Sequence, residues 1–276
     1  MTPATGTPLP PPSVLRAFRI TGRPEPLEGG QGRSVRAGDA VLKPAGDGAD
    51  VEWAATLMDA LQDRPGFRVP RYLRAVGGGH VVEGWEATRF LTGGPGPAGR
   101  WDALLAAGRA FHEALRDVPR PKRLDGHQHP WAVADRVAWG GATAEVPAPV
   151  HRLATRLRAL REPVDARAQL VHGDLTGNVL FAPGQAPAVI DFSPYWRPVG
   201  YAEAIVVVDG LLHHRAGHRL ADSVLPGAEG AQMLLRALIF RLVALGIAAG
   251  PGGALAEDEW TAFTRVSQFA EDRLAA

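Results

Sequence analysis

The amino-acid sequence predicts an α+β fold with two lobes, a small antiparallel β-rich N-lobe and a larger, mostly helical C-lobe. Residues 26–91 read mainly as short strands with glycine-containing turns between them. From residue 101 onward the apolar residues recur at helical spacing, interrupted by a few short strands. The stretch Thr-Gly-Gly-Pro-Gly-Pro at 92–97 separates the two patterns and is typical of a hinge. We therefore expect a Pro-rich tail over residues 1–12, an N-lobe over 13–91 and a C-lobe over 92–276.

The composition is that of a globular protein. Hydrophobic residues make up 46% of the 276 residues and include nine Phe and seven Trp, which is ample for a packed core. The formal net charge of +1 gives no overall field that would attract nucleic acid or a membrane surface. The absence of cysteine excludes disulfides and thiolate chemistry, and no stretch reaches the roughly 20 apolar residues of a spanning helix. We expect a cytoplasmic protein with no nucleic-acid or membrane partner.

In the predicted N-lobe, a glycine-rich loop joins two strands, and a helix follows the third strand. Gly38-Asp39 is a good signal for a tight turn. Trp53, Leu57 and Leu61 then recur at the spacing of one helical face. The predicted elements are a helix over 13–20, strands over 26–27, 35–37 and 40–43, a helix from about residue 50, and a hairpin that joins 68–76 to 80–91 through three glycines.

The predicted C-lobe consists of amphipathic or apolar helices with three short strands among them. The strands lie near the middle of the lobe, where the polar motif described below is found. The predicted helices cover residues 101–116, 131–139, 150–161, 202–213, 231–245 and 257–274, and the strands cover 169–171, 179–181 and 188–190.

The most informative segment is 171–181, which contains the chain's only asparagine, Asn178. Lysine is almost as rare, with two among the 30 basic residues. In a composition that avoids Asn and Lys, a survivor indicates a specific chemical demand. Asn178 and the later acid Asp191 offer amide and carboxylate oxygens, the ligands that Mg²⁺ prefers. Asp174 would then be left to accept the proton of a hydroxyl group during phosphoryl transfer.

The motifs H-G-D at residues 172–174, Asn178, and I-D-F at residues 190–192 resemble the signature of the aminoglycoside phosphotransferase and choline kinase superfamily. These enzymes are relatives of the protein kinases. The resemblance covers about residues 25–215 and implies a protein-kinase-like fold for this chain.

The resemblance assigns a role to each residue of the motif. Asp174 would be the catalytic base, Asn178 and Asp191 would bind Mg²⁺, and His172 would buttress the loop. Three residues separate Asp174 from Asn178, one fewer than is usual in the family. Gly177 can adopt backbone conformations that are closed to other residues, so it could absorb the deletion.

The resemblance also implies a nucleotide site in the N-lobe. Lys43, at the end of the third strand, would contact the α- and β-phosphates, and Glu52, early in the following helix, would pair with Lys43. Adenine would meet the backbone near Arg89 and Phe90, where the lobes join. The loop over the phosphates would be formed by Gly29, Gly30, Gly32 and Ser34.

These inferences predict a kinase that uses Mg²⁺ and transfers the γ-phosphate of ATP or GTP to a hydroxyl of an aminoglycoside-, sugar- or amino-alcohol-like acceptor. The alternative is a catalytically degenerate nucleotide-binding scaffold of the same fold. Asp209, the one acid in the apolar segment 206–211, either anchors the catalytic loop or faces the acceptor. His112 is expected to pack in the core. The other histidine clusters are expected at the surface rather than at a metal, namely His127 with His129, and His213, His214 and His218.

Overall fold

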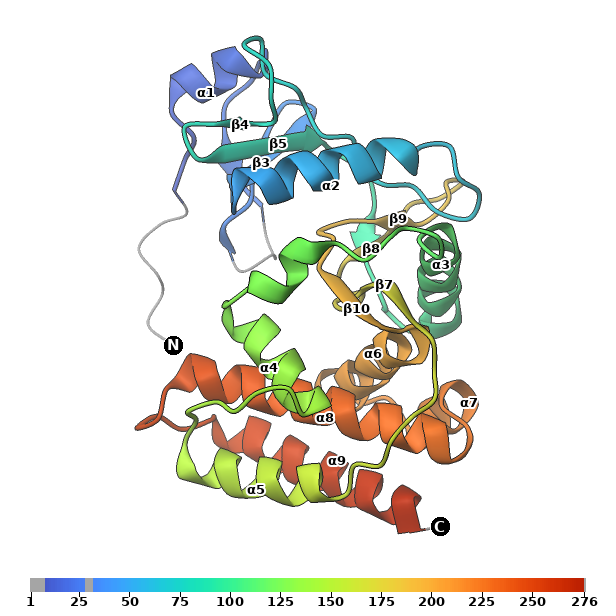
Figure 1. Cartoon of the computed structure of the whole chain (residues 1–276). Coiled ribbons are helices and arrows are strands. Elements are labelled where there is room, and N and C mark those ends of the chain that lie inside the picture. The colour runs from blue at the N-terminus through green and yellow to red at the C-terminus, as the bar shows by residue number, and fades with distance from the viewer. Residues whose placement is uncertain (1–7, 28–31, 276) are drawn as a thin grey trace. The chain divides into compact units, whose positions relative to one another are not determined.

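The structure, a computed structural model, describes residues 8–27 and 32–275. Gly29 and Gly30 of the predicted phosphate loop lie outside the described residues. The chain forms two compact units: a β-rich unit, Met1–Ala98 with Asn178–Ile190, and a helical unit, Gly99–Gly177 with Asp191–Ala276. Figure 1 shows the strands of the first and the helices of the second. The predicted α+β class is confirmed.

The β-rich unit consists of short strands with two helices among its described residues. These are α1 (Pro12–Ala17), β1 (Glu25–Pro26), β2 (Val35–Ala37), β3 (Ala40–Pro44), α2 (Gly48–Ala60), β4 (Val81–Val82), β5 (Trp85–Arg89), β6 (Gly94–Pro95), β8 (Val179–Phe181) and β9 (Ala188–Val189). An antiparallel sheet has the strand order β1-β2-β3-β5-β4, and a smaller one has the order β6-β8-β9. Val14 and Phe18 of the N-terminal segment pack with Leu42 and Trp85 of the larger sheet.

Gly38 makes the predicted tight turn between β2 and β3. Its φ is +59°, and a Cβ at this position would lie 2.4 Å from the carbonyl oxygen of Thr21. Glycine is therefore required both by the backbone conformation and by the close approach. The turn sets the register of β2 against β3, with Val35 opposite Leu42. On its other side β3 pairs with β5, and Lys43 lies opposite Glu86.

The hairpin predicted from 68–76 to 80–91 is wrong in its first arm. Residues 68–76 form no regular strand and join β5 through a bridge between Tyr72 and Thr88. The hairpin is made by β4 and β5 instead, through the two-residue turn 83–84, where both φ angles are positive as a type I′ turn requires. Pro70 has no N–H to donate to a ladder, which explains why the first arm is irregular.

The segment 178–190 belongs to the β-rich unit although it lies far along the chain. β8 pairs with both β6 and β9. The Arg68 N–H donates to the Pro187 carbonyl at 2.7 Å, and the Arg68 carbonyl accepts the Val189 N–H at 2.8 Å. The compact unit thus extends to Ala98 and includes this hairpin, whereas the N-lobe expected from sequence ended earlier and lacked it. Residues 68 and 187–189 are far apart in the chain, so no local sequence pattern predicts that they pair.

The helical unit contains all the helices predicted after residue 100, and in addition η2, β10 and α7, which the sequence did not predict. The prolines at both ends of β10 argue against a strand in a sequence pattern. The elements are α3 (Trp101–Ala114), the 3₁₀ helix η2 (Lys122–Gly126), α4 (Pro130–Trp139), α5 (Ala148–Ala159), β7 (Ala168–His172), β10 (Pro194–Pro198), α6 (Val199–His213), α7 (His218–Val224), α8 (Gly227–Ala249) and α9 (Glu257–Ala275).

α8 is the central helix of the helical unit. It packs against α4, α5, α6 and α9, and Figure 1 shows it running between them. Among the described residues, α8 is the one helix that is long and apolar enough to cross a membrane, and 83% of its apolar window is buried in the protein. Its composition is therefore explained by its place in the core.

Candidate active site

The H-G-D motif connects β7 to the loop that carries Asp174. A Cβ on Gly173 would lie 2.4 Å from the Tyr195 ring, so glycine is needed where β7 and β10 come together. The Gly173 N–H donates to the Ser193 carbonyl at 2.9 Å. Leu175 is buried just beyond the motif. The loop is thus fixed on both sides of Asp174, whose side chain is 41% exposed.

His172 connects the motif to the core. Its side chain is fully buried, and its Nδ1 accepts the backbone N–H groups of Asp174 at 3.2 Å and Ser193 at 3.4 Å. The backbone N–H of His172 donates to Nε2 of the His112 ring at 3.0 Å. Burial, with a smaller contribution from His172, lowers the pKa of His112 to about 3, so this ring is neutral and can accept. His112 is a core histidine, as predicted.

Arg241, on α8, binds Asp174 and was not anticipated from the sequence. Its Nη2 donates to Asp174 Oδ1 at 2.7 Å. The same guanidinium binds Asp209 in two places, from Nε to Oδ1 at 2.7 Å and from Nη2 to Oδ2 at 2.6 Å. Asp209 therefore connects to the loop of the H-G-D motif through Arg241, which favours the anchoring role of the two left open for it. The sequence signal was an arginine in a largely apolar helix, but the same helix also carries Arg236.

Asn178 and Asp191, the predicted Mg²⁺ ligands, stand at the ends of the β8–β9 pair. The Asn178 carbonyl accepts the Ile190 N–H at 2.9 Å, so the ladder continues one residue beyond the strands, and Asp191 is the next residue in the chain. Asp191 is exposed and has a φ of +51°, which is rare outside glycine and frequent at functional sites. Gly177 has a φ of +82°, the freedom expected of it. Amide and carboxylate oxygens suit Mg²⁺.

Lys43 and Glu52 have different partners from those predicted. Lys43 Nζ lies 3.3 Å from Glu86 Oε1, and the Glu86 side chain is 6% exposed. The Glu52 carboxylate instead contacts the backbone N–H of His80 at 2.6 Å and the Nδ1 atom of the His80 ring at 2.7 Å. The predicted Lys43–Glu52 pair is therefore wrong, because the register of β3 and β5 puts an acid directly opposite the lysine. These hydrogen bonds to His80 lower the pKa of Glu52.

The remaining described residues of the predicted nucleotide site lie in the β-rich unit. Gly32 is exposed with a φ of +67°, and Ser34 is half-buried. The N–H groups of Arg89 and Phe90 donate to carbonyls of the same unit, each at 2.8 Å. A base that binds there would need other backbone groups of this segment.

The other histidine clusters make contacts between rings. The rings of His127 and His129 lie 5.6 Å apart, and His218 stacks on Phe269. Within the described ranges, no three His, Asp or Glu side chains form a group that could hold a metal.

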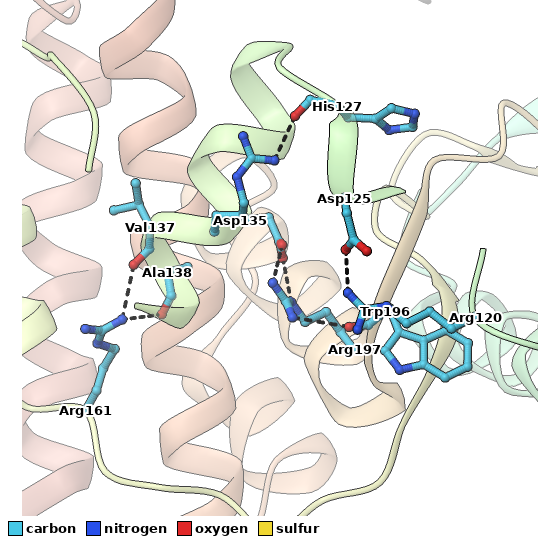
Figure 2. Close-up of polar contacts among 10 residues, drawn as sticks. Arg120, Asp125, His127, Asp135, Val137, Ala138, Arg161, Trp196 and Arg197 are labelled. Atoms are coloured by element: carbon cyan, nitrogen blue, oxygen red, sulfur yellow. Dashed lines mark hydrogen bonds and ion pairs between the residues drawn. The ribbon is translucent and has the colours of Figure 1, made fainter. Parts of the chain in front are cut away.

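A second arginine–aspartate pair lies in the helical unit, in which Asp135 is buried and the Arg197 side chain is 23% exposed. Arg197 binds Asp135 from Nε at 3.0 Å and from Nη2 at 2.6 Å (Figure 2). Its Nη1 donates to the Trp196 carbonyl at 3.3 Å, and its guanidinium lies 4.9 Å from the Trp139 ring. Burial raises the pKa of Asp135 although Arg197 opposes the shift. Nearby, Arg161 donates to two carbonyls at the end of α4.

The chain belongs to the phosphotransferase enzyme family, whose model matches residues 26–195. The match includes every residue of the H-G-D and I-D-F motifs. The chain is thus a phosphotransferase, of the aminoglycoside phosphotransferase and choline kinase superfamily of enzymes that act on hydroxyl groups. No curated protein sequence matches the chain.

Solved structures share the fold at low sequence identity. An aminoglycoside phosphotransferase from Alicyclobacillus acidocaldarius is 18% identical with a TM-score of 0.65, over 99% of this chain and 96% of that one. The choline kinase LicA from Streptococcus pneumoniae is 11% identical with a TM-score of 0.60, over 94% and 97%. A spectinomycin phosphotransferase in complex with ADP and spectinomycin is 12% identical with a TM-score of 0.56, over 94% and 96%. At these identities the comparison establishes the fold.

Proposed function

We propose that this chain is a Mg²⁺-dependent small-molecule kinase that transfers the γ-phosphate of ATP or GTP to a hydroxyl group. The observation that carries the proposal is Asp174, a half-exposed carboxylate held by a buried arginine, in a member of a phosphotransferase family. The acceptor would be an aminoglycoside-, sugar- or amino-alcohol-like compound. The similar structure of a spectinomycin phosphotransferase with ADP and spectinomycin supports a nucleotide and a small-molecule acceptor.

In the β-rich unit, Lys43 would bind the nucleotide phosphates. Its ion pair with the buried Glu86 restrains the flexible lysine side chain, so that less conformational entropy is lost when a phosphate binds. The backbone N–H groups of the glycine loop would cover the phosphates, as such groups do in other nucleotide sites. The loop residues in this role are Gly29, Gly30, Gly32 and Ser34.

Asn178 and Asp191 would hold the Mg²⁺ ion. When bound, the ion neutralises the charge that develops on the transferring phosphoryl group. The chain contributes two hard oxygen donors and leaves the remaining positions to water and phosphate oxygens, as Mg²⁺ prefers.

Asp174 would orient the acceptor hydroxyl and take its proton. The transition state of phosphoryl transfer is loose, so a base that aligns the attacking oxygen contributes mainly by positioning. General base catalysis usually supplies about 10²–10⁴-fold in rate. The contacts of Asp174 with His172 and Arg241 determine where this carboxylate can point.

The proposal includes a cytoplasmic location, where nucleoside triphosphates are abundant, and excludes nucleic-acid and membrane partners. The net charge of +1 supplies no field for a polyanion. The apolar helix α8 is accounted for by its burial in the core.

The test is a phosphorylation screen with Mg²⁺ and γ-labelled ATP or GTP across aminoglycosides, sugars and amino alcohols. Asp174→Ala should keep nucleotide binding, measured by calorimetry, and lose turnover by about 10²–10⁴-fold. Asp222→Ala, at a 61% exposed carboxylate on α7, is the matched control and should keep full turnover.

Two outcomes would contradict the proposal. Near-wild-type turnover in Asp174→Ala would remove this residue from the chemistry. Tight Mg-nucleotide binding with no transfer to any acceptor or to water would instead favour the nucleotide-binding scaffold.

A further inference from the structure

We propose that Arg241 is a positioning residue, which fixes the orientation of the Asp174 carboxylate and is itself anchored by Asp209. This inference rests on the proposed function, because it concerns how Asp174 performs its role. It adds a residue from α8, outside the residues that the family model matches.

The geometry leaves the Arg241 guanidinium little freedom. Asp209 occupies Nε and one hydrogen of Nη2, at 2.7 and 2.6 Å, in the two-point arrangement that matches a planar guanidinium. Nη2 then directs its other hydrogen to Asp174 Oδ1 at 2.7 Å. The orientation of the plane is set by Asp209, so the direction of the bond to Asp174 is set as well.

Both supporting residues come from rigid elements. Arg241 lies on α8 and Asp209 on α6, two helices packed against each other in the core. The side chains of Arg241 and Asp209 are 10% and 6% exposed, whereas Asp174 sits on a loop and is 41% exposed. A loop side chain that must point in one direction needs support of this kind, because sites on helices and strands are held more accurately than sites on loops.

The charges also fit the proposed role. Burial would lower the pKa of the Arg241 guanidinium, but Asp209 and then Asp174 more than offset this, so the pKa is raised and the cation is permanent. A carboxylate that works beside nucleotide phosphates experiences repulsion from like charges. A permanent cation bound to Asp174 reduces that repulsion without competing for the proton, since arginine does not act as an acid at neutral pH.

A purely structural role is the competing explanation, because a second arginine of the helical unit is held by an aspartate in the same way. Arg197 makes the same two-point contact with Asp135 but ends on a backbone carbonyl and a tryptophan ring. This second pair therefore offers a matched control of the same chemistry in the same unit.

The experiment compares two charge-neutral double variants, Arg241→Met with Asp209→Asn and Arg197→Met with Asp135→Asn. Each removes a pair without leaving a lone buried charge, since Asp174, the other partner of Arg241, is 41% exposed. In the first, we expect kcat to fall by about 10²-fold, as for a misplacement of about 1 Å in a reacting group. Its nucleotide Kd should stay within about twofold and its acceptor KM should change little. The control pair should keep kcat.

The readouts are calorimetry for nucleotide and initial rates with an acceptor from the screen, or ATP hydrolysis with water as the acceptor. Arg241→Lys, with Asp209 intact, keeps the charge but not the planar fork, and should recover part of kcat. If the Arg241 double variant does not fold, Asp209→Asn removes the anchor and leaves the cation; it should lower kcat while circular dichroism and nucleotide Kd stay unchanged.

An unchanged kcat in a folded Arg241 double variant would overturn the inference, and so would an equal loss of kcat in the Arg197 control. Both results would leave the proposed function intact if Asp174→Ala still abolishes turnover. If Asp174→Ala retains turnover, the proposed function itself fails, whatever the Arg241 variants do.

Discussion

Arg241 with Asp209 and Arg197 with Asp135 are two pairs of similar construction, and their arginine side chains are 10% and 23% exposed. In each, Nε and Nη2 bind the two oxygens of one aspartate, and the aspartates are 6% and 7% exposed. They differ in the third partner. Arg241 also binds the half-exposed Asp174 of the H-G-D motif, whereas Arg197 also binds the carbonyl of its neighbour Trp196.

The difference teaches that the chemistry of a buried ion pair does not reveal its role. Both pairs satisfy buried charges and tie together helices or strands of the helical unit. One of them also transmits its rigidity to a group that solvent can reach. What distinguishes an arginine that supports a site from one that supports only the fold is its further partner, not its bond to the buried aspartate.

The largest effect is expected on the free energy of unfolding, when the arginine of either pair is replaced and its charge is lost. Arg241→Met and Arg197→Met should each lower the free energy of unfolding by about 3–5 kcal/mol, because each leaves an aspartate buried without its partner. Urea denaturation followed by circular dichroism measures the loss. A loss below about 1 kcal/mol for either variant would show that water reaches the orphaned carboxylate.

A smaller effect concerns the second support of Asp174, the contact between His112 and His172. The pKa of His112 is lowered to about 3, so as the pH falls below about 6.5 the unfolded state takes up a proton that the folded state refuses. Stability should therefore decrease with falling pH, by up to about 1.4 kcal/mol per unit between pH 6.5 and 3.

The check is urea denaturation at pH 7 and pH 5. His112→Gln should reduce the difference in unfolding free energy between the two pH values by about 2 kcal/mol. The exposed His151, on α5, serves as the control, and His151→Gln should leave the difference as it is. If the unfolding free energy of His112→Gln depends on pH as in the wild type, the loss of stability at low pH does not come from His112.

The smallest effect extends the comparison to the β-rich unit, where two glutamates were candidates for one lysine. Glu86→Gln should weaken Mg-nucleotide binding about tenfold, or 1.4 kcal/mol, because Lys43 loses its charged partner. Glu52→Gln should change the affinity by less than about twofold, because Glu52 is half-exposed and binds His80. Calorimetry measures the nucleotide affinity of both variants. A larger loss of affinity in Glu52→Gln than in Glu86→Gln would identify Glu52 as the partner of Lys43.

Much of the plan was readable from the sequence. The helices 101–116 and 131–139 formed where the periodicity placed them, and the strand 179–181 formed with the predicted bounds. Helical spacing and glycine turns are local signals, so they survive in a single sequence. The segment 68–76 meets the predicted partner 80–91 but forms no regular strand, because Pro70 has no N–H to donate to a ladder.

The sequence by itself determined the fold class, the family motif and the candidacy of Asp174, Asn178 and Asp191, because those features depend on residue identity at short spacing. Only the tertiary structure decided that Lys43 pairs with Glu86 and that Asp174 is bound by Arg241. The two partners are 43 and 67 residues away along the chain. Contacts at such distances follow from strand register and helix packing, which no local pattern encodes.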